Sequence, residues 1–230
     1  MKKISNPFRD LSRFELLLWL SSMIVVTLSF LLPDEKDFLN LIASLFGVTA
    51  LIFIAKGYLI GQVFVIIFAV FYGIISIYFR YYGEAITYLG MSAPGAIASF
   101  VSWMRHPHGK SREVEVNRLT RRNVILSVPL VVAVTVAFYF ILDALGTANL
   151  IPSTLSIATS CLAAYLTFLR SPYYALAYAA NDVVLIVLWT LAAIKNISYL
   201  PMIFCFVMFL FNDIYGFINW RRMREKQKNG

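Results

Sequence analysis

The residues best suited to chemistry in this sequence are polar groups that interrupt long apolar runs. Two Asn-Asp pairs lie inside such runs, Asn181-Asp182 and Asn212-Asp213. Ionisable groups within a bilayer cost a few kcal/mol or more, so they usually face a cavity or a partner group. Because both pairs lie in the second half of the chain, we expect Asn181 and Asn212 to converge on one cavity and to bind a small polar ligand.

Further polar and aromatic residues extend this candidate site. Tyr215 and Asn219 follow Asn212 by three and seven positions, so the three side chains share one stripe of a helix. The groups within apolar runs that we expect at the ligand site are Asn181, Asp182, Asn212, Tyr215, Trp189, Gln62 and Tyr72. For Asp182 and Asp213 three roles stay open: counter-ion to a cationic ligand, partner of a nearby basic group, or a position at the membrane interface.

A structural role is the alternative for each of these residues. Asn and Asp in membrane helices also hydrogen-bond neighbouring helices and hold the bundle together. Tyr and Trp near helix ends often belong to the aromatic belt at the membrane interface, and Trp220 beside Arg221 fits that pattern.

The composition indicates that these residues are carried by membrane helices. Of the 230 residues, 60% are hydrophobic and 14% are charged, whereas a soluble domain has about 25% charged residues. The net charge of +8 comes from short basic loops, which argues against a nucleic-acid partner. Cys161 and Cys205 lie in apolar runs, and His106 and His108 share a loop without a metal-binding pattern, so we expect no metal and no cofactor.

Apolar runs bounded by charged or turn residues predict an all-α polytopic membrane protein. A spanning helix needs roughly 20 apolar residues, which leaves room for about eight spans. Backbone groups in hydrocarbon must be satisfied within the segment, so each run is expected to be helical. The predicted spans are 14–32, 38–55, 59–79, 84–104, 123–142, 150–169, 173–194 and 198–220.

The basic residues predict the orientation of these spans. Lys and Arg gather on one side, in the first thirteen residues, the loop 105–122 and the C-terminal tail, while the other side has little beyond Lys36, Arg80 and Lys195. Basic residues in short loops favour the cytoplasm. We therefore expect an even number of spans in a cell membrane, with both termini and the central loop cytoplasmic.

The two halves of the chain repeat one pattern. A helix ends at Lys56-Gly57 in the first half and at Arg170-Ser171 in the second, and each half closes on a Trp followed by basic residues. Two parallel three-helix repeats joined by a linker helix satisfy this pattern and place a binding site where the repeats meet. The expected segments are an extra N-terminal helix (1–37), the first repeat (38–104), a cytoplasmic loop with the linker helix (105–149), the second repeat (150–220) and a basic cytoplasmic tail (221–230).

Particular motifs resemble the PnuC family of nicotinamide riboside transporters. The likeness covers about residues 38–220. Its most specific parts are Ala55-Lys56-Gly57, Tyr72, Tyr82-Gly83-Glu84, Pro94 ahead of Trp103, and Asn212 to Tyr215-Gly216 to Trp220.

The resemblance implies a core of three, one and three helices, similar to the SWEET sugar transporters, after an added N-terminal helix. It further implies facilitated diffusion of a vitamin across a bacterial-type cell membrane, trapping of the nucleoside by a cytoplasmic kinase, and a homotrimer.

Departures from the family pattern concern the ligand. The Trp-x-x-Trp pair of familiar members is replaced here by a segment in which Tyr174 or Tyr178 can supply ring stacking, and Ala96 stands where they have Gln. Thiamine, riboflavin and deoxynucleosides therefore remain alternatives to nicotinamide riboside. An intramembrane enzyme is a less favoured alternative, because no nucleophile with a base and no metal cluster is visible.

Overall fold

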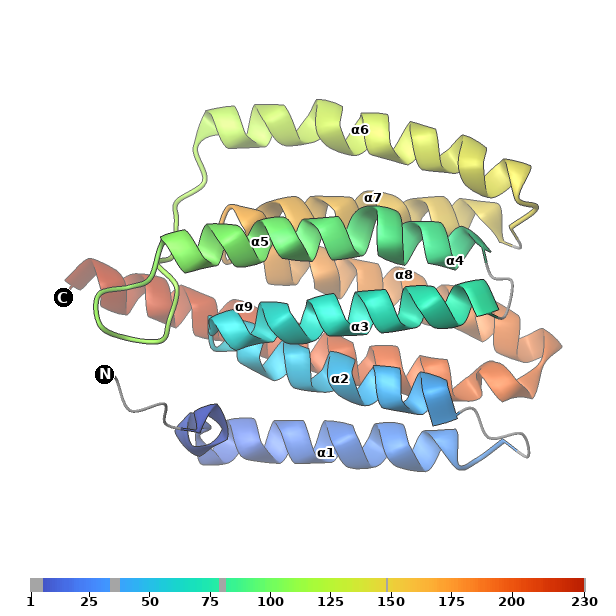
Figure 1. The fold of residues 1–230 in the computed structure, drawn as a ribbon, viewed down its shortest axis with the longest axis horizontal. Coiled ribbons are helices and arrows are strands. Elements are labelled where there is room, and N and C mark those ends of the chain that lie inside the picture. Colours follow the sequence, from blue (N-terminus) through green and yellow to red (C-terminus); the bar gives the residue numbers. More distant parts are fainter. Residues whose placement is uncertain (1–5, 34–37, 79–81, 148, 230) are drawn as a thin grey trace.

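The computed structural model describes residues 6–33, 38–78, 82–147 and 149–229. Their helices lie side by side with roughly aligned axes, and helical segments account for all regular structure in these residues apart from isolated β-bridges in loops (Figure 1). In chain order they are η1 (Pro7–Asp10), α1 (Arg13–Phe30), α2 (Phe38–Ala55), α3 (Leu59–Tyr78), α4 (Tyr82–Thr87), the π-helical η2 (Tyr88–Ser92), α5 (Ala93–Arg105), α6 (Arg121–Ala144), α7 (Leu150–Phe168), α8 (Tyr174–Lys195), η3 (Ile197–Tyr199) and α9 (Leu200–Asn229).

The helices confirm the predicted all-α membrane architecture. Within the described residues, seven helices are long and apolar enough to cross a membrane, and α3 adds the apolar stretch Leu59–Ile74. The tail after residue 220 continues α9 as helix instead of leaving it. Lys36 and Arg80, which entered the charge comparison, lie outside the described residues.

One predicted span contains a π-helical segment. The run 84–104 forms α4, the π-helical turns of η2 and then α5, with the Ala93 N–H donating to the Tyr88 carbonyl. Pro94, at the start of α5, has no N–H to donate and its ring crowds the preceding turn, which favours a widened turn at this point.

The internal repeat is visible in the way corresponding helices end. α2 and α7 both finish in a left-handed residue, Gly57 (φ 67°) and Arg170 (φ 57°). The N–H of Gly57 donates to the carbonyl of Ile54 at 2.8 Å, and that of Arg170 donates to the carbonyl of Thr167 at 2.9 Å. The following residue in each repeat donates five positions back, which completes a Schellman motif at both corners.

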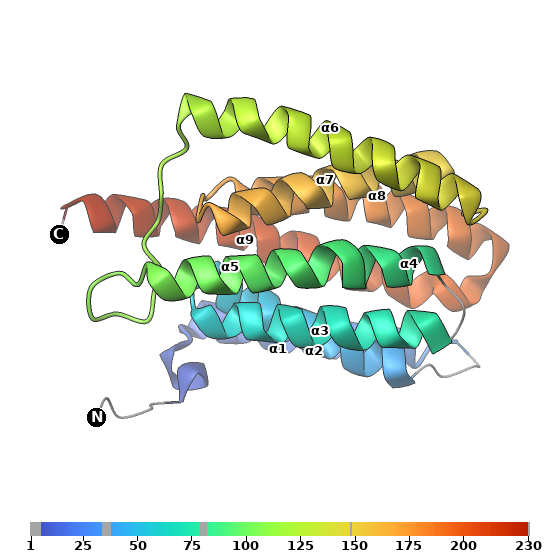
Figure 2. The same cartoon turned by 45° about the horizontal axis from the view of Figure 1, so that its top comes forward.

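The remaining helices lie at opposite edges of the two repeats. α2, α3 and α4–α5 form the first repeat and α7, α8 and α9 form the second, while α1 packs against α2 and α9, and α6 packs chiefly against α7 (Figures 1 and 2). The loop 106–120 and the C-terminal end of α9 lie at one end of the bundle (Figure 1). We call this the basic end, because Lys56, Arg170 and the basic residues of the loop and tail lie there.

The central loop joins the two corners at the basic end. The N–H of Val114 donates to the carbonyl of Gly57 at 2.9 Å, and that of Asn117 donates to the carbonyl of Arg170 at 3.0 Å. The loop therefore contacts equivalent positions of both repeats and satisfies backbone carbonyls that the helix ends leave open.

Candidate functional site

A cavity of about 1170 Å³ lies between the two repeats. All helical segments of both repeats contribute to its wall, and it reaches the loops around residues 145–149 and 195–199 at the end opposite the basic end. Ligand-binding pockets typically measure about 300–1,000 Å³, so the cavity has room for a small molecule with bound water.

Toward the basic end, buried aromatic rings close the cavity. Its wall stops at Ile54, Thr167 and Tyr174, and beyond them the ring of Trp103 lies 5.3 Å from that of Trp220. The Tyr174 ring lies 5.0 Å from Trp220 and edge-on to it. The structure therefore has a cavity that is accessible from one end of the bundle and blocked at the other.

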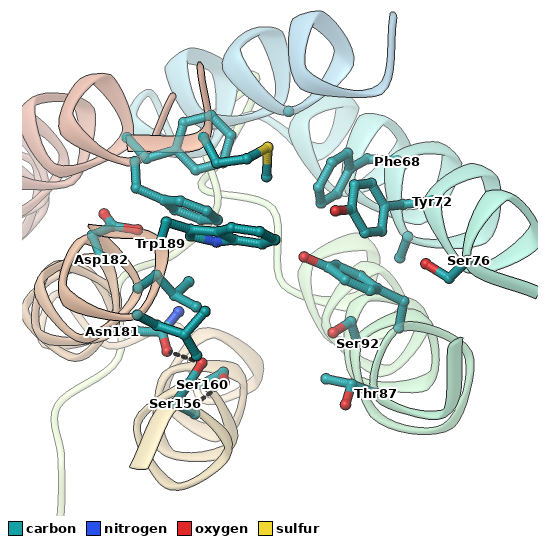
Figure 3. Close-up of a pocket in the computed structure, with 18 of the residues that line it drawn as sticks. Phe68, Tyr72, Ser76, Thr87, Ser92, Ser156, Ser160, Asn181, Asp182 and Trp189 are labelled. Atoms are coloured by element: carbon teal, nitrogen blue, oxygen red, sulfur yellow. Dashed lines mark hydrogen bonds between the residues drawn. The ribbon is translucent and has the colours of Figure 1, made fainter. Parts of the chain in front are cut away.

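Asn181 presents its amide nitrogen to the cavity. Its Oδ1 accepts hydrogen bonds from Ser156 Oγ and Thr159 Oγ1 of α7, each at 2.9 Å. These two hydroxyl groups fix the side-chain amide, and Figure 3 shows its nitrogen turned away from α7. Because an amide nitrogen only donates, Asn181 offers a ligand a hydrogen-bond donor.

Three buried polar atoms that belong to residues of the cavity wall make no hydrogen bond among the described residues. They are Gln62 Nε2, Trp189 Nε1 and Asp182 Oδ2, all buried. A buried polar atom without a partner costs about 1–3 kcal/mol. A ligand recovers that cost if the side chains of Gln62, Trp189 and Asp182 turn these atoms toward it, so the wall can adapt to a polar ligand.

Aromatic rings from the two repeats face each other across the cavity. Trp189 of α8 lies opposite Phe68 and Tyr72 of α3 (Figure 3). Tyr72 also packs against Tyr88 of η2, with ring centroids 4.5 Å apart. A flat heterocycle fits this arrangement, because aromatic pairs favour offset or edge-on contact at such distances.

Most of the residues expected at the ligand site line the cavity. Those brought together in its wall are Gln62, Tyr72, Tyr174, Tyr178, Asn181, Asp182 and Trp189. Tyr174 also forms part of the aromatic closure at the basic end.

Asn212 and Tyr215 lie elsewhere, which corrects their expected position. Asn212 Nδ2 donates to Ser22 Oγ of α1 at 3.0 Å, and Tyr215 Oη donates to Glu15 Oε1 of α1 at 2.7 Å. Their shared stripe on α9 faces α1, so the Asn212 amide nitrogen and the Tyr215 hydroxyl find their partners on a neighbouring helix rather than in the cavity.

Asp213, whose role the sequence left open, lines the cavity, and so do three residues that were not singled out from the sequence: Ser153, Ser156 and Ser160 of α7. The three serines are spaced at i, i+3 and i+7, which places them on one face of a helix. That spacing is a signal in the sequence, because it marks a polar stripe along an otherwise apolar span.

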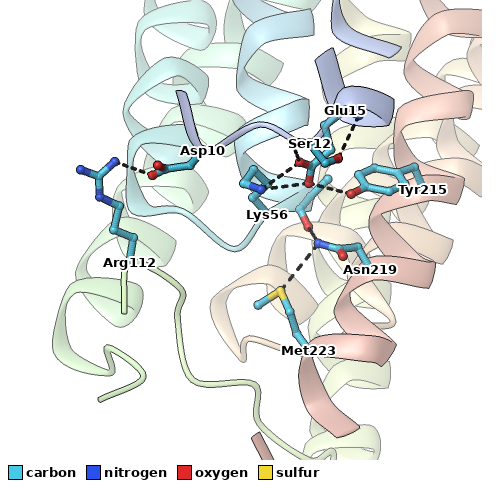
Figure 4. A network of polar contacts seen from close by, with 9 residues as sticks. Asp10, Ser12, Glu15, Lys56, Arg112, Tyr215, Asn219 and Met223 are labelled. Atoms are coloured by element: carbon cyan, nitrogen blue, oxygen red, sulfur yellow. Dashed lines mark hydrogen bonds and ion pairs between the residues drawn. The ribbon is translucent and has the colours of Figure 1, made fainter. Parts of the chain in front are cut away.

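A polar network at the basic end is separate from the cavity. Lys56 Nζ lies 2.9 Å from Glu15 Oε2, and Asn219 Nδ2 donates to the Ala55 carbonyl at 2.9 Å (Figure 4). Glu15 also completes a capping box with Ser12 at the start of α1. The network joins α1 to the last turns of α2 and to α9, so its role is to position α1.

Comparison with known proteins agrees with this architecture. Residues 37–222 match a family described as nicotinamide mononucleotide transporter. The nicotinamide riboside transporter PnuC of Neisseria mucosa is 27% identical over 213 residues, which cover 90% of this chain and 81% of the relative. A solved structure titled as the crystal structure of the vitamin B3 transporter PnuC superposes with a TM-score of 0.79 at 26% identity, over 94% of both chains. This chain is therefore a multi-pass membrane protein that belongs to the nicotinamide mononucleotide transporter family.

Proposed function

We propose that this protein takes up nicotinamide riboside by facilitated diffusion through the cavity between its repeats. The observation that carries the proposal is a wall whose residues Gln62, Asn181 and Trp189 carry hydrogen-bond donors not used within the protein, beside aromatic rings from both repeats. The likeness to proteins named for nicotinamide riboside and vitamin B3 transport supports this choice of ligand.

The chemistry of nicotinamide riboside suits this wall. Its flat pyridinium ring is cationic and fits between Trp189 and Tyr72, where a desolvated cation on a ring gains about 2 kcal/mol. Its carboxamide and ribose oxygens can accept from Gln62 and Asn181. A ribose hydroxyl can donate to Asp182 Oδ2, which otherwise has no partner among the described residues.

Access alternates between the two ends of the bundle in this proposal. The basic end lies in the cytoplasm of a cell with both termini inside, because basic residues in short loops favour that side. The cavity then faces outward, and rocking of one repeat against the other opens the Trp103–Trp220 closure to the cytoplasm. The ligand leaves unchanged, and no chemical reaction on it is part of this cycle.

The assembly and segment boundaries follow the same proposal. We place the repeats at 38–104 and 150–220, with the linker in 105–149, and we propose a homotrimer whose imported nucleoside is trapped by a separate cytoplasmic kinase. Crosslinking in native membranes tests the trimer, since a ladder that stops at the dimer contradicts it.

Uptake into liposomes tests the function. Purified protein in liposomes is given radiolabelled nicotinamide riboside, thiamine, riboflavin and deoxynucleosides in parallel, with empty liposomes as the control. We expect nicotinamide riboside to enter until the concentrations are equal on both sides. Preferential uptake of thiamine, riboflavin or a deoxynucleoside overturns the choice of ligand, and uptake of none overturns the transport function.

A further inference from the structure

Two carboxyl groups meet in the cavity wall. Asp182 of α8 and Asp213 of α9 both line the cavity, and each residue is only 3% exposed. Their side chains lie close enough to interact with each other. Two carboxylates buried side by side repel each other, so ionisation of both is disfavoured. The cavity wall therefore holds a carboxyl pair that favours keeping one proton.

None of the described cationic side chains neutralises this pair. In the part of the chain that the structure describes, neither carboxyl group contacts Lys or Arg. The titratable groups that face the pair are the phenols of Tyr174 and Tyr178 on α8 and the thiol of Cys205 on α9, with Cys161 of α7 behind Tyr178 and Ser44 of α2 against Cys205. All of these groups are neutral in their usual protonation state. Buried charge must then be balanced by a proton or by a ligand.

We propose that the Asp182–Asp213 pair exchanges a proton for the positive charge of a cationic ligand. This inference rests on the proposed function, which brings a pyridinium ring into the cavity. As the cation enters, one carboxyl O–H bond breaks, the proton passes to water at the open end of the cavity, and the carboxylate becomes the counter-ion. One positive charge arrives and one leaves, so the net charge of the cavity stays constant.

The position of Asp182 supports exchange over a purely structural hydrogen bond between α8 and α9. Asp182 lines the cavity, and its buried Oδ2 accepts no hydrogen bond from a described donor, so the protein offers that oxygen no substitute for a proton or a ligand. A structural bond between the helices keeps its proton whether or not a ligand is bound. A measurement of proton release on ligand binding therefore distinguishes proton exchange from a purely structural role.

Calorimetry of the purified protein measures this release directly. Nicotinamide riboside is titrated at one pH in two buffers that differ in ionisation enthalpy, and the difference in heat gives the number of protons released. We expect about one proton per ligand. The reduced, uncharged form of nicotinamide riboside serves as a ligand control of nearly the same shape and should bind without releasing a proton.

Each outcome of the titration bears on the proposal. Heat that is independent of buffer for the cationic ligand overturns it, as does equal proton release with the uncharged ligand. Binding without release overturns this inference alone. Binding of neither form overturns the proposed function and this inference with it.

Variants provide a second test. In the double variant Asp182→Asn/Asp213→Asn the amides can still hydrogen-bond to each other, yet neither has a proton to exchange. We expect no proton release and weaker binding of the cation. The wild-type affinity should fall about tenfold per pH unit as the pH is lowered, and this dependence should vanish in the double variant. Asp143→Asn, an exposed acid outside the cavity wall, is the matched control and should behave as wild type. Unchanged proton release in the double variant overturns the assignment, and the wild-type titration stands if that variant does not fold.

Discussion

Trp103 and Trp220 are in contact, and each donates a hydrogen bond to the first helix of the opposite repeat. Trp103 Nε1 donates to the Thr167 carbonyl of α7 at 2.9 Å, and Trp220 Nε1 donates to the Ile54 carbonyl of α2 at 2.8 Å. The accepting carbonyls occupy equivalent positions in the two repeats, because the left-handed corners of α2 and α7 follow them directly. The closure at the basic end is thus itself symmetric.

Replacing either indole with a phenyl ring should weaken this closure. Trp103→Phe and Trp220→Phe keep an aromatic ring but remove the hydrogen bond between the repeats, while each carbonyl still accepts from the N–H of its own helix corner. We expect each to lower the free energy of unfolding by about 1 kcal/mol, measured by denaturant unfolding in detergent. Trp189→Phe is the control, because the Trp189 N–H has no acceptor among the described residues. An equal loss in the control contradicts the role of the two hydrogen bonds.

Substitution of Asn181 should lower the affinity for the ligand, whereas substitution of Asn212 should lower the stability of the protein. Asn181→Ala removes a donor that faces the cavity, so we expect nicotinamide riboside affinity to fall by about 1 kcal/mol, or roughly fivefold. Asn212→Ala leaves the Ser22 hydroxyl without its donor and should lower thermal stability while the affinity of folded protein is unchanged. Calorimetric titration and thermal unfolding of both variants make the comparison. A larger loss of affinity in Asn212→Ala contradicts the site described here.

Breaking the ion pair that joins α1 to α2 should destabilise the protein. Glu15→Gln leaves the Lys56 ammonium, whose side chain is 14% exposed, without a charged partner. We expect a loss of about 1.5–3 kcal/mol in the free energy of unfolding, as for hydrogen bonds to charged groups. Asp10→Asn removes the more exposed pair with Arg112 and should cost at most about 1 kcal/mol. Equal losses in the two variants would show that burial does not set the strength of the Glu15–Lys56 pair.

A methyl group at the corner of the first repeat should be poorly tolerated. Gly57 has φ 67°, and a Cβ there would lie 2.6 Å from Met223 Cε. Gly146 has φ 65° with no atom near an added Cβ, so Gly146→Ala carries only the cost of the left-handed backbone, about 1–2 kcal/mol. Gly57→Ala should lower the melting temperature more than Gly146→Ala. A smaller effect at Gly57 would mean that Met223 moves aside freely.

The sequence predicted the helices and much of the cavity because both follow from the cost of polar groups in hydrocarbon. Asn181, Asp182 and Trp189 stand out as polar groups in apolar runs, and the corners at Gly57 and Arg170 mark the repeat. The same rule failed for Asn212, because it requires a hydrogen-bond partner without saying where that partner lies.

Two further features depend on tertiary contacts. Tyr215 was expected at the cavity, and only the packing of α1 against α9 reveals that Glu15 accepts its hydrogen bond. In the π-helical turns at Tyr88–Ser92, the Tyr88 ring packs against Tyr72 of another helix, and the spacing of residues along the chain does not reveal that contact.

The linker helix α6 meets the rest of the bundle chiefly through α7, and much of its apolar surface is exposed. A connection held chiefly on one side reverses the chain direction but does little to set the distance between the two repeats. We therefore expect the two halves to assemble even when they are separate chains. Two polypeptides divided near residue 148, one ending with the linker and the other beginning at α7, should reassemble when made in the same cell.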